Sequence, residues 1–545
     1  MLHLLLSAIL TTITINSTQD FRSEIVTPNR EYIIGGDIYL TANESIAIGS
    51  NSILRFNGGC IHNGILVGQN TRIANPSDSV IFDDVELAYE ENPANNAPIT
   101  GWLGECKDVW FSYSEATKAH FKIVKSVCQF ETCLFSRRTY YIEQWARIPL
   151  RCFGCEIRGD GTTFILPGNK GSLSSVPGVG NRPQYATHCL FEKGCVNIFP
   201  GYNNGERAGR FIVSGLTILD NDEVIREQGW GESMSDFGIT VNPPNPQSTV
   251  GFTYYKIFRG GANYIEFKNV TYDGCGGLWT DFDHYIHIHQ FLIEDCCIKC
   301  AQFAFEFKTM SGQNITSAKN QNMTTCGGYC DSLRISRCHF RNYAENLLVG
   351  PLSFVSDEPG YTIHHLLVEN CVFYSEKEAN LELSGCEYID IRNNAFLSVQ
   401  CSSDHATSGG QTVRINKKTD IVGNRFLISD PPAAADGLRI CSGDLFLLGN
   451  EFVLDFSKAT TGAFSIIGYG DNTAFISGNT FLFKRTDITS QKTFFIYRDI
   501  LPWMQGNHYI PENGLANGQT IVIVGDGYPG YLETGIDPRF SLSIP

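Results

Sequence analysis

Charged residues are scarce in this sequence, and acidic residues outnumber basic ones. Asp, Glu, Lys and Arg make up 18% of the 545 residues, which is below the roughly 25% of typical soluble chains. The formal net charge is −16, and the sequence contains no long run of like charges. A protein that binds nucleic acid presents a basic face, so this composition argues against nucleic-acid binding.

Long stretches of helix-forming residues are also few, and no apolar stretch is long enough to cross a bilayer. Helix is therefore expected to be a minor component. Residues 1–15 are apolar, as in the central region of a signal peptide, but no Lys or Arg precedes Arg22. Residues 1–20 are thus a candidate signal peptide or N-terminal segment, and both interpretations stay open.

A short phrase, Asn or Cys placed two residues before Phe, returns through the second half of the chain. Its Phe residues are separated by 33, 23, 30, 26 and 29 positions and are Phe340, Phe373, Phe396, Phe426, Phe452 and Phe481. A period of roughly 20 to 50 residues with short β-patterned units is typical of a solenoid. The unequal spacing indicates stacked β-rungs joined by turns of different length.

The pattern predicts an all-β chain, a right-handed parallel β-helix with a short N-terminal helix or cap region and an atypical C-terminal cap. Residues 21–139 should form N-terminal rungs with a helical cap insertion, 140–500 the β-helix, and 501–545 a cap or oligomerisation segment. Apolar residues near helical spacing make 114–126 the best helix candidate.

Cysteine usage points to a structural role. The count is 19, which rules out complete pairing within one chain. Cys338 and Cys371 both stand two residues before a repeat Phe, a position at which Cys acts as a small buried apolar residue. We expect reduced thiols in the core there. One or two local disulfides elsewhere remain open.

The Asn-x-Phe rungs resemble the right-handed parallel β-helix repeats of pectate-lyase-like proteins. The segments 51–73 and 157–164 are similar to the N-terminal portion of such proteins from gut Bacteroidetes and their phages. This resemblance implies the fold. It leaves the reaction open, because lyases, hydrolases, epimerases and phage tailspike depolymerases share the scaffold.

One dense polar cluster, residues 279–289, is the best candidate for chemistry. Strand alternation places two carboxylates, two imidazoles and two aromatic side chains on the outer face, and puts Phe282 and His284 on the inner face. An offset of 23 residues then stacks Glu306 over Asp283 and Lys308 over Tyr285, and a further 26 residues reaches Arg334. The candidate catalytic residues are Asp281, Asp283, His287, Glu306, Lys308 and Arg334, and the candidate substrate-binding residues are Trp230, Trp279, Tyr285 and His289.

Such a patch suits cleavage of a complex polysaccharide that contains uronates, by β-elimination. Ca²⁺ held by Asp281 and Asp283 would neutralise the substrate carboxylate. A glycoside hydrolase with two carboxyl groups across neighbouring rungs is the alternative. A non-catalytic glycan-binding adhesin or phage tailspike is the third. The expected partner is a polysaccharide, the expected location is extracellular, on a cell surface or on a virion, and a homotrimer is one expected assembly.

Overall fold

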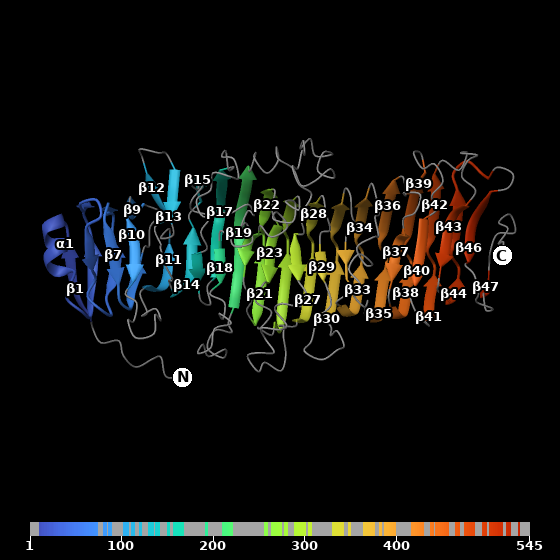
Figure 1. The fold of residues 1–545 in the computed structure, drawn as a ribbon, viewed down its shortest axis with the longest axis horizontal. Coiled ribbons are helices and arrows are strands. Elements are labelled where there is room, and N and C mark those ends of the chain that lie inside the picture. The colour runs from blue at the N-terminus through green and yellow to red at the C-terminus, as the bar shows by residue number, and fades with distance from the viewer. Residues whose placement is uncertain are drawn as a thin grey trace, which may run out of the picture. The chain divides into compact units, whose positions relative to one another are not determined.

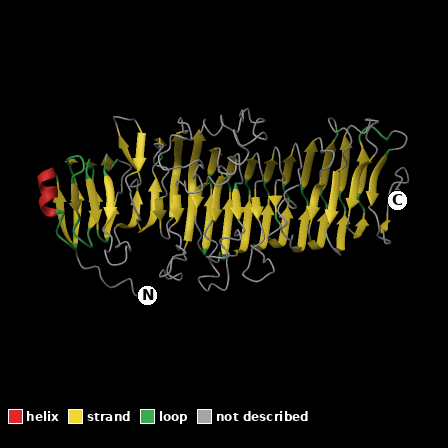
Figure 2. Ribbon diagram, in the orientation of Figure 1, coloured by secondary structure: helices red, strands yellow, loops and turns green. Residues whose placement is uncertain are grey.

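The computed structural model divides the chain into two compact units, residues 1–275 and 276–545. The structure describes residues 10–74, 80–83, 85–89, 102–107, 111–114, 119–122, 129–135, 137–141, 150–152, 156–167, 191–193, 210–221, 256–259, 263–274, 277–281, 288–300, 304–307, 330–342, 347–349, 363–375, 381–383, 386–398, 416–429, 436–440, 442–456, 464–468, 473–484, 493–498, 501–515, 519–524 and 532–534. Strands dominate these residues (Figure 2). The predicted all-β parallel solenoid is confirmed.

The first unit begins with a strand and a short helix that cover the end of its core (Figure 1). Strand β1 (Thr11–Ile15) pairs in parallel with β2 (Arg30–Ile34), so part of the candidate N-terminal segment forms the first rung. Helix α1 (Thr18–Glu24) is capped by Ser17, whose hydroxyl accepts a hydrogen bond from the backbone N–H of Asp20. Phe21 of this helix is fully buried.

Parallel pairing then continues through the first unit from rung to rung. The strands of its main ladder are β5 (Ile53–Phe56), β8 (Thr71–Ala74), β11 (Trp102–Lys107), β14 (Gln129–Phe135), β15 (Thr139–Tyr141), β17 (Glu156–Pro167), β19 (Arg210–Asn221), β21 (Tyr264–Lys268) and β22 (Thr271–Gly274). Buried apolar residues alternate with exposed ones in the strands with described side chains, as in Ile53–Phe56.

The helix expected at 114–126 is wrong. Strands β12 (Phe111–Ser114) and β13 (Ala119–Lys122) form an antiparallel pair there instead. Aromatic residues alternating with polar ones favour a strand in Phe111–Ser114, and strand pairing satisfies the backbone groups that a helix would have satisfied internally.

Each rung of the second unit contains two consecutive strands joined at a bend. The strands before the bend, here called the first ladder, are β24 (Gln290–Glu294), β27 (Cys330–Ser336), β30 (Ile363–Glu369), β33 (Cys386–Arg392), β35 (Asn416–Val422), β38 (Ser442–Leu448), β41 (Thr473–Ser477) and β44 (Leu501–Gln505). The strands after it are β25 (Cys297–Cys300), β28 (His339–Asn342), β31 (Val372–Ser375), β34 (Ala395–Ser398), β36 (Arg425–Ser429), β39 (Glu451–Asp455), β42 (Thr480–Lys484) and β45 (His508–Pro511).

Further strands belong to separate parallel sheets of the second unit. One set is β23 (Gly277–Asp281), β26 (Phe305–Phe307), β29 (Leu347–Val349) and β32 (Leu381–Glu382). The other is β37 (Asp436–Ile440), β40 (Phe464–Gly468), β43 (Thr493–Arg498) and β46 (Thr520–Val524). Because β44, β45 and β46 pair with the rungs before them, residues 501–524 of the expected cap contain further rungs.

The repeated phrase of the sequence lies at the bend. A residue with positive φ, such as Asn393 or Gly423, turns the chain. The next residue is the buried Asn or Cys of the phrase, and its Phe packs inside the core. The Phe rings stack from rung to rung, with centroids 4.9 Å apart between Phe396 and Phe426. The short phrase therefore marks one full rung each time it occurs.

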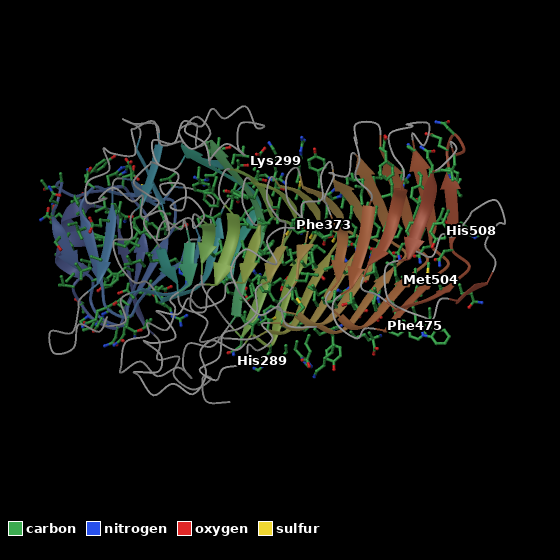
Figure 3. The ribbon with its side chains drawn as sticks, turned by 45° about the vertical axis from the view of Figure 1, so that its right-hand side comes forward. His289, Lys299, Phe373, Phe475, Met504 and His508 are labelled. Carbon is green, nitrogen blue, oxygen red and sulfur yellow. The ribbon has the colours of Figure 1, made fainter. Side chains whose placement is uncertain are left out.

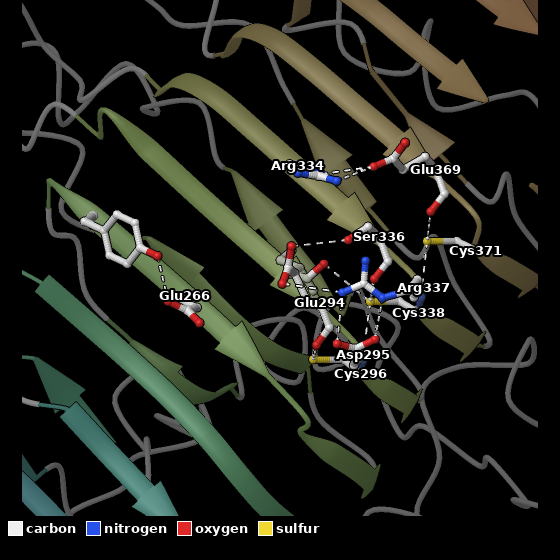
Figure 4. Close-up of polar contacts among 12 residues, drawn as sticks. Glu266, Glu294, Asp295, Cys296, Arg334, Ser336, Arg337, Cys338, Glu369 and Cys371 are labelled. Carbon is white, nitrogen blue, oxygen red and sulfur yellow. Dashed lines mark hydrogen bonds and ion pairs between the residues drawn. The ribbon is translucent and has the colours of Figure 1, made fainter. Parts of the chain in front are cut away.

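Buried Asn side chains connect these bends. The ladder residues, as we call the Asn and Cys of the phrase together with Asn507, which stands two residues before Tyr509, are Cys338, Cys371, Asn394, Asn424, Asn450, Asn479 and Asn507. Each one after Cys338 accepts a hydrogen bond from the backbone N–H of the ladder residue before it, as in Asn394 to Asn424 at 2.8 Å. Cys338 and Cys371 are buried thiols outside any disulfide, which confirms the core role expected for them (Figure 4).

Candidate functional site

The predicted polar cluster lies mostly outside the described residues. Asp283, Tyr285, His287, Lys308 and Trp230 all fall there. For Trp279, Asp281 and Glu306 the structure describes the backbone alone, in β23 and β26. Their proposed chemical roles therefore stay predictions.

The backbone of β23 and β26 does test the expected register. Thr280 pairs with Glu306, and Asp281 pairs with Phe307. The offset between the two strands is thus 26 residues, and the expected offset of 23 is wrong. Rung length varies along this solenoid, so an offset inferred from side-chain alternation alone could not fix the pairing.

Arg334 does not continue that cluster either. It lies on β27 of the first ladder and pairs in register with Leu292, whereas β26 belongs to a separate sheet. Its guanidinium donates to Glu369 Oε1 from Nε at 3.1 Å and from Nη2 at 2.6 Å (Figure 4). The exposed His289 makes a 3.1 Å contact from Nδ1 to Asp331 Oδ2. The described members of the predicted site are therefore engaged in surface ion pairs.

A different arrangement runs along the outer face of the first ladder. In each strand, the residue four positions before the ladder residue points away from the core. Strand pairing aligns these residues in a single file. We call this file the outer column, and its members are Arg334, Leu367, Asp390, Asp420, Phe446, Phe475 and Trp503. Neighbouring strands lie about 4.8 Å apart, so the column presents a side chain at that interval.

Carboxylates and cations alternate beside the middle of the column. Asp390 accepts a hydrogen bond from Arg392 Nη2 at 2.8 Å and contacts His365 Nε2 at 3.3 Å. On the next rung Lys418 Nζ donates to Asp420 at 2.7 Å. Asp390 and Asp420 are register partners, so two carboxyl groups lie side by side between three basic side chains.

Glu387, near the start of β33, is more buried than Asp390 or Asp420, with its side chain 9% exposed. It forms ion pairs with His364 on one neighbouring strand and with Lys417 on the other. Lys417 also lies over the ring of Tyr388, with its Nζ 5.8 Å from the ring centroid. Glu387 therefore connects three adjacent rungs of the outer face.

Glu387 and Asp390 are both held in the ionised form. Burial raises the pKa of Glu387 and is the largest influence on it, but hydrogen bonds from Lys417 and His364 outweigh burial, so this pKa lies below its ordinary value. The pKa of Asp390 is also lowered, because hydrogen bonds from Arg392 and His365 outweigh its burial. Ionised carboxylates accept hydrogen bonds but cannot donate a proton, so these two groups suit binding better than general-acid catalysis.

Aromatic side chains take over at the end of the column. The rings of Phe446 and Phe475 stack with centroids 5.1 Å apart and an interplanar angle of 7°. Lys418 lies over the Phe446 ring, with its Nζ 4.9 Å from the centroid. Phe475 is 40% exposed and Trp503 is 55% exposed, and Figure 3 shows Phe475 on the outer side of the sheet.

The outer face does not suit a calcium ion. Its carboxylates are already paired with Arg, Lys and His, and a divalent cation would have to displace them. Among the residues that the structure describes, no three His, Cys, Asp or Glu side chains are grouped as a metal site requires. In the same part of the chain, no helix is long and apolar enough to span a membrane.

Comparison with protein-family models, with curated proteins and with solved structures finds no match for this chain. Functional inference therefore depends on the geometry of the described residues.

Proposed function

We propose that this protein recognises a complex polysaccharide along the outer column of its second unit, outside the cell that makes it. The observation that carries the proposal is the unbroken register of the column from Asp390 to Trp503. A surface that repeats at each rung suits an extended polymer that repeats at each sugar. Paired carboxylates that accept hydroxyl hydrogen bonds, followed by exposed aromatic rings, are the groups that sugar-binding surfaces need.

The resemblance to pectate-lyase-like β-helix proteins supports the same substrate class. Cleavage by β-elimination is the second candidate function. Its support is His365, an imidazole in contact with Asp390 of the outer column, because elimination needs a base near the polymer. Glu387 and Asp390, whose pKa values are lowered, do not supply the protonated form that a hydrolase requires of its general acid, so hydrolysis has less support here.

Affinity electrophoresis tests recognition. The full chain would be run through gels that contain xylan, mannan, galactan, polygalacturonate or dextran. Recognition predicts retardation by at least one polymer. Asp390→Asn with Asp420→Asn should weaken it about tenfold or more, because each lost charge-assisted hydrogen bond is worth roughly 1.5 kcal/mol or more.

Glu451→Gln is the matched control. Glu451 lies on β39, after the bend and therefore outside the outer column, and it forms an ion pair with Arg425 at 3.0 Å. It should leave retardation unchanged. Failure of every polymer to retard the wild-type chain would contradict the proposal. The same polymers, assayed for unsaturated products by ultraviolet absorbance and for new reducing ends, decide between a lyase, a hydrolase and a binding protein.

A further inference from the structure

The aromatic end of the outer column differs in chemistry from its charged middle. Phe446, Phe475 and Trp503 occupy equivalent register positions on β38, β41 and β44. The sequences of β41 and β44 contain no charged residue. Two positions after Phe475 and Trp503, on the same side of the strand, lie Ser477 and Gln505, which are register partners of each other, whereas Leu448 holds the equivalent position after Phe446.

These residues present two parallel rows to solvent. One row is aromatic, and the other offers uncharged hydrogen-bonding groups. A pyranose ring has an apolar face of C–H groups and an edge of hydroxyl groups, so it can contact both rows at once. The exposed fractions of 40% for Phe475 and 55% for Trp503 leave the rings accessible for such contact.

We propose that Phe446, Phe475 and Trp503 form a stacking subsite for uncharged sugar units of a polysaccharide that runs along the outer column. Asp420 and Asp390 then contact the units that follow on the same chain. The inference rests on the proposed function and adds the position of the subsite, the direction of the chain and the neutral character of the units bound there. A polymer with charged units at other positions can still use the charged middle of the column.

A second copy of this chain is the competing occupant of the aromatic row. A stable interface buries about 800 Å² on each partner and has an apolar centre. The row consists of three aromatic residues, with Leu448 two positions after Phe446 and Leu532 as the register partner of Trp503. It is bordered by Ser477 and Gln505 on one side and is followed along the column by ion pairs. That composition favours a sugar chain over a protein surface.

The test uses single and double variants of the full chain. Trp503→Ala should weaken retardation by the retarding polymer about tenfold, and Trp503→Ala with Phe475→Ala should weaken it further, because aromatic anchors at binding sites are typically worth about 1–2 kcal/mol or more. Trp503→Phe should retain part of the affinity. Ile510→Ala is the matched control. Ile510 is an apolar residue on β45, outside the outer column, and its exposed fraction of 46% lies between those of Phe475 and Trp503.

Tryptophan fluorescence gives an independent readout, since titration with the same polymer should change the emission of the wild type but not that of Trp503→Phe.

Sedimentation mass is measured for each protein. Unchanged retardation of the double variant would overturn the stacking subsite while leaving the proposed function standing. A mass that falls from oligomer to monomer in Trp503→Ala would assign the row to self-association instead. Failure of the wild type to bind any polymer would instead contradict the proposed function itself.

Discussion

The side-chain oxygen of Asn450 accepts two hydrogen bonds from Asn424, one from its backbone N–H at 2.8 Å and one from its Nδ2 at 3.1 Å. Asn450 in turn donates from its own Nδ2 to the carbonyl of Ile421 at 2.8 Å. Both residues are almost fully buried. One side chain thus satisfies two backbone groups of the neighbouring rung that water cannot reach, and the ladder makes neighbouring rungs depend on each other.

Asn450→Ala is therefore expected to destabilise the second unit strongly. The substitution leaves the N–H of Asn424 and the carbonyl of Ile421 buried without these partners, at a cost of about 1–3 kcal/mol for each group. Chemical denaturation followed by circular dichroism measures the loss. Asn393→Gly is the control, because Asn393 turns the bend with φ of 55°, a conformation that glycine adopts freely. If both variants unfolded at the same denaturant concentration, the ladder would have little energetic role.

The buried thiols of the ladder should be inert in the folded protein. The hydrogen bond with a neighbouring thiol, and then burial, raise the pKa of both Cys338 and Cys371, and burial raises the pKa of Cys386. Alkylation requires the thiolate, so these three residues should stay unmodified by iodoacetamide at about pH 8 until denaturant is added. Cys297, which is exposed, is the internal control and should react in the native state. Peptide mapping by mass spectrometry reads each site, and native labelling of Cys371 would contradict its buried position.

The rungs could be predicted from the sequence because they rest on a local signal. Asn or Cys two residues before Phe sets the bend, and the Phe residues stack as that spacing predicts. The candidate site was harder to predict, because rungs differ in length and pairing cannot be obtained by adding a constant number of residues. Counting four residues back from each ladder residue does recover the outer column, including Asp390 and Trp503. His364 and His365 carry no such signal by themselves, since their carboxylate partners come from another rung.

Acid should weaken the second unit through Glu387 and Asp390. Their pKa values are lower in the folded chain than the ordinary 4.5 and 3.8. Their stabilising contribution is therefore complete above those ordinary values and is lost as the pH falls through the folded values. The melting temperature should drop as the pH falls below about 4.5, and Glu387→Gln should show a smaller drop because it has no carboxyl group to protonate. A slope for Glu387→Gln that is identical to that of the wild type would contradict the linkage.

The N-terminal cap should respond to acid in a lower range. Arg22 of α1 donates to both oxygens of Glu44, from Nε at 2.7 Å and from Nη2 at 2.8 Å, and the backbone N–H of Thr41 donates to the same carboxylate at 2.8 Å. The hydrogen bond from Arg22, followed by that from Thr41, lowers the pKa of Glu44 from 4.5 to about 2. The contact is complete above pH 4.5 and is lost as the pH approaches 2.

Hydrogen exchange of the β1 and α1 amides at about pH 6, where the carboxylate is fully ionised, should therefore be faster in Glu44→Gln than in the wild type. The variant weakens the contact that holds α1 over the core, and Phe21 is the side chain that this helix buries. Glu31→Gln is the control for the α1 amides, because Glu31 pairs with Arg55 and accepts a hydrogen bond from Thr12, both of which lie on strands. Equal exchange in Glu44→Gln and the wild type would show that burial of Phe21 alone holds the cap in place.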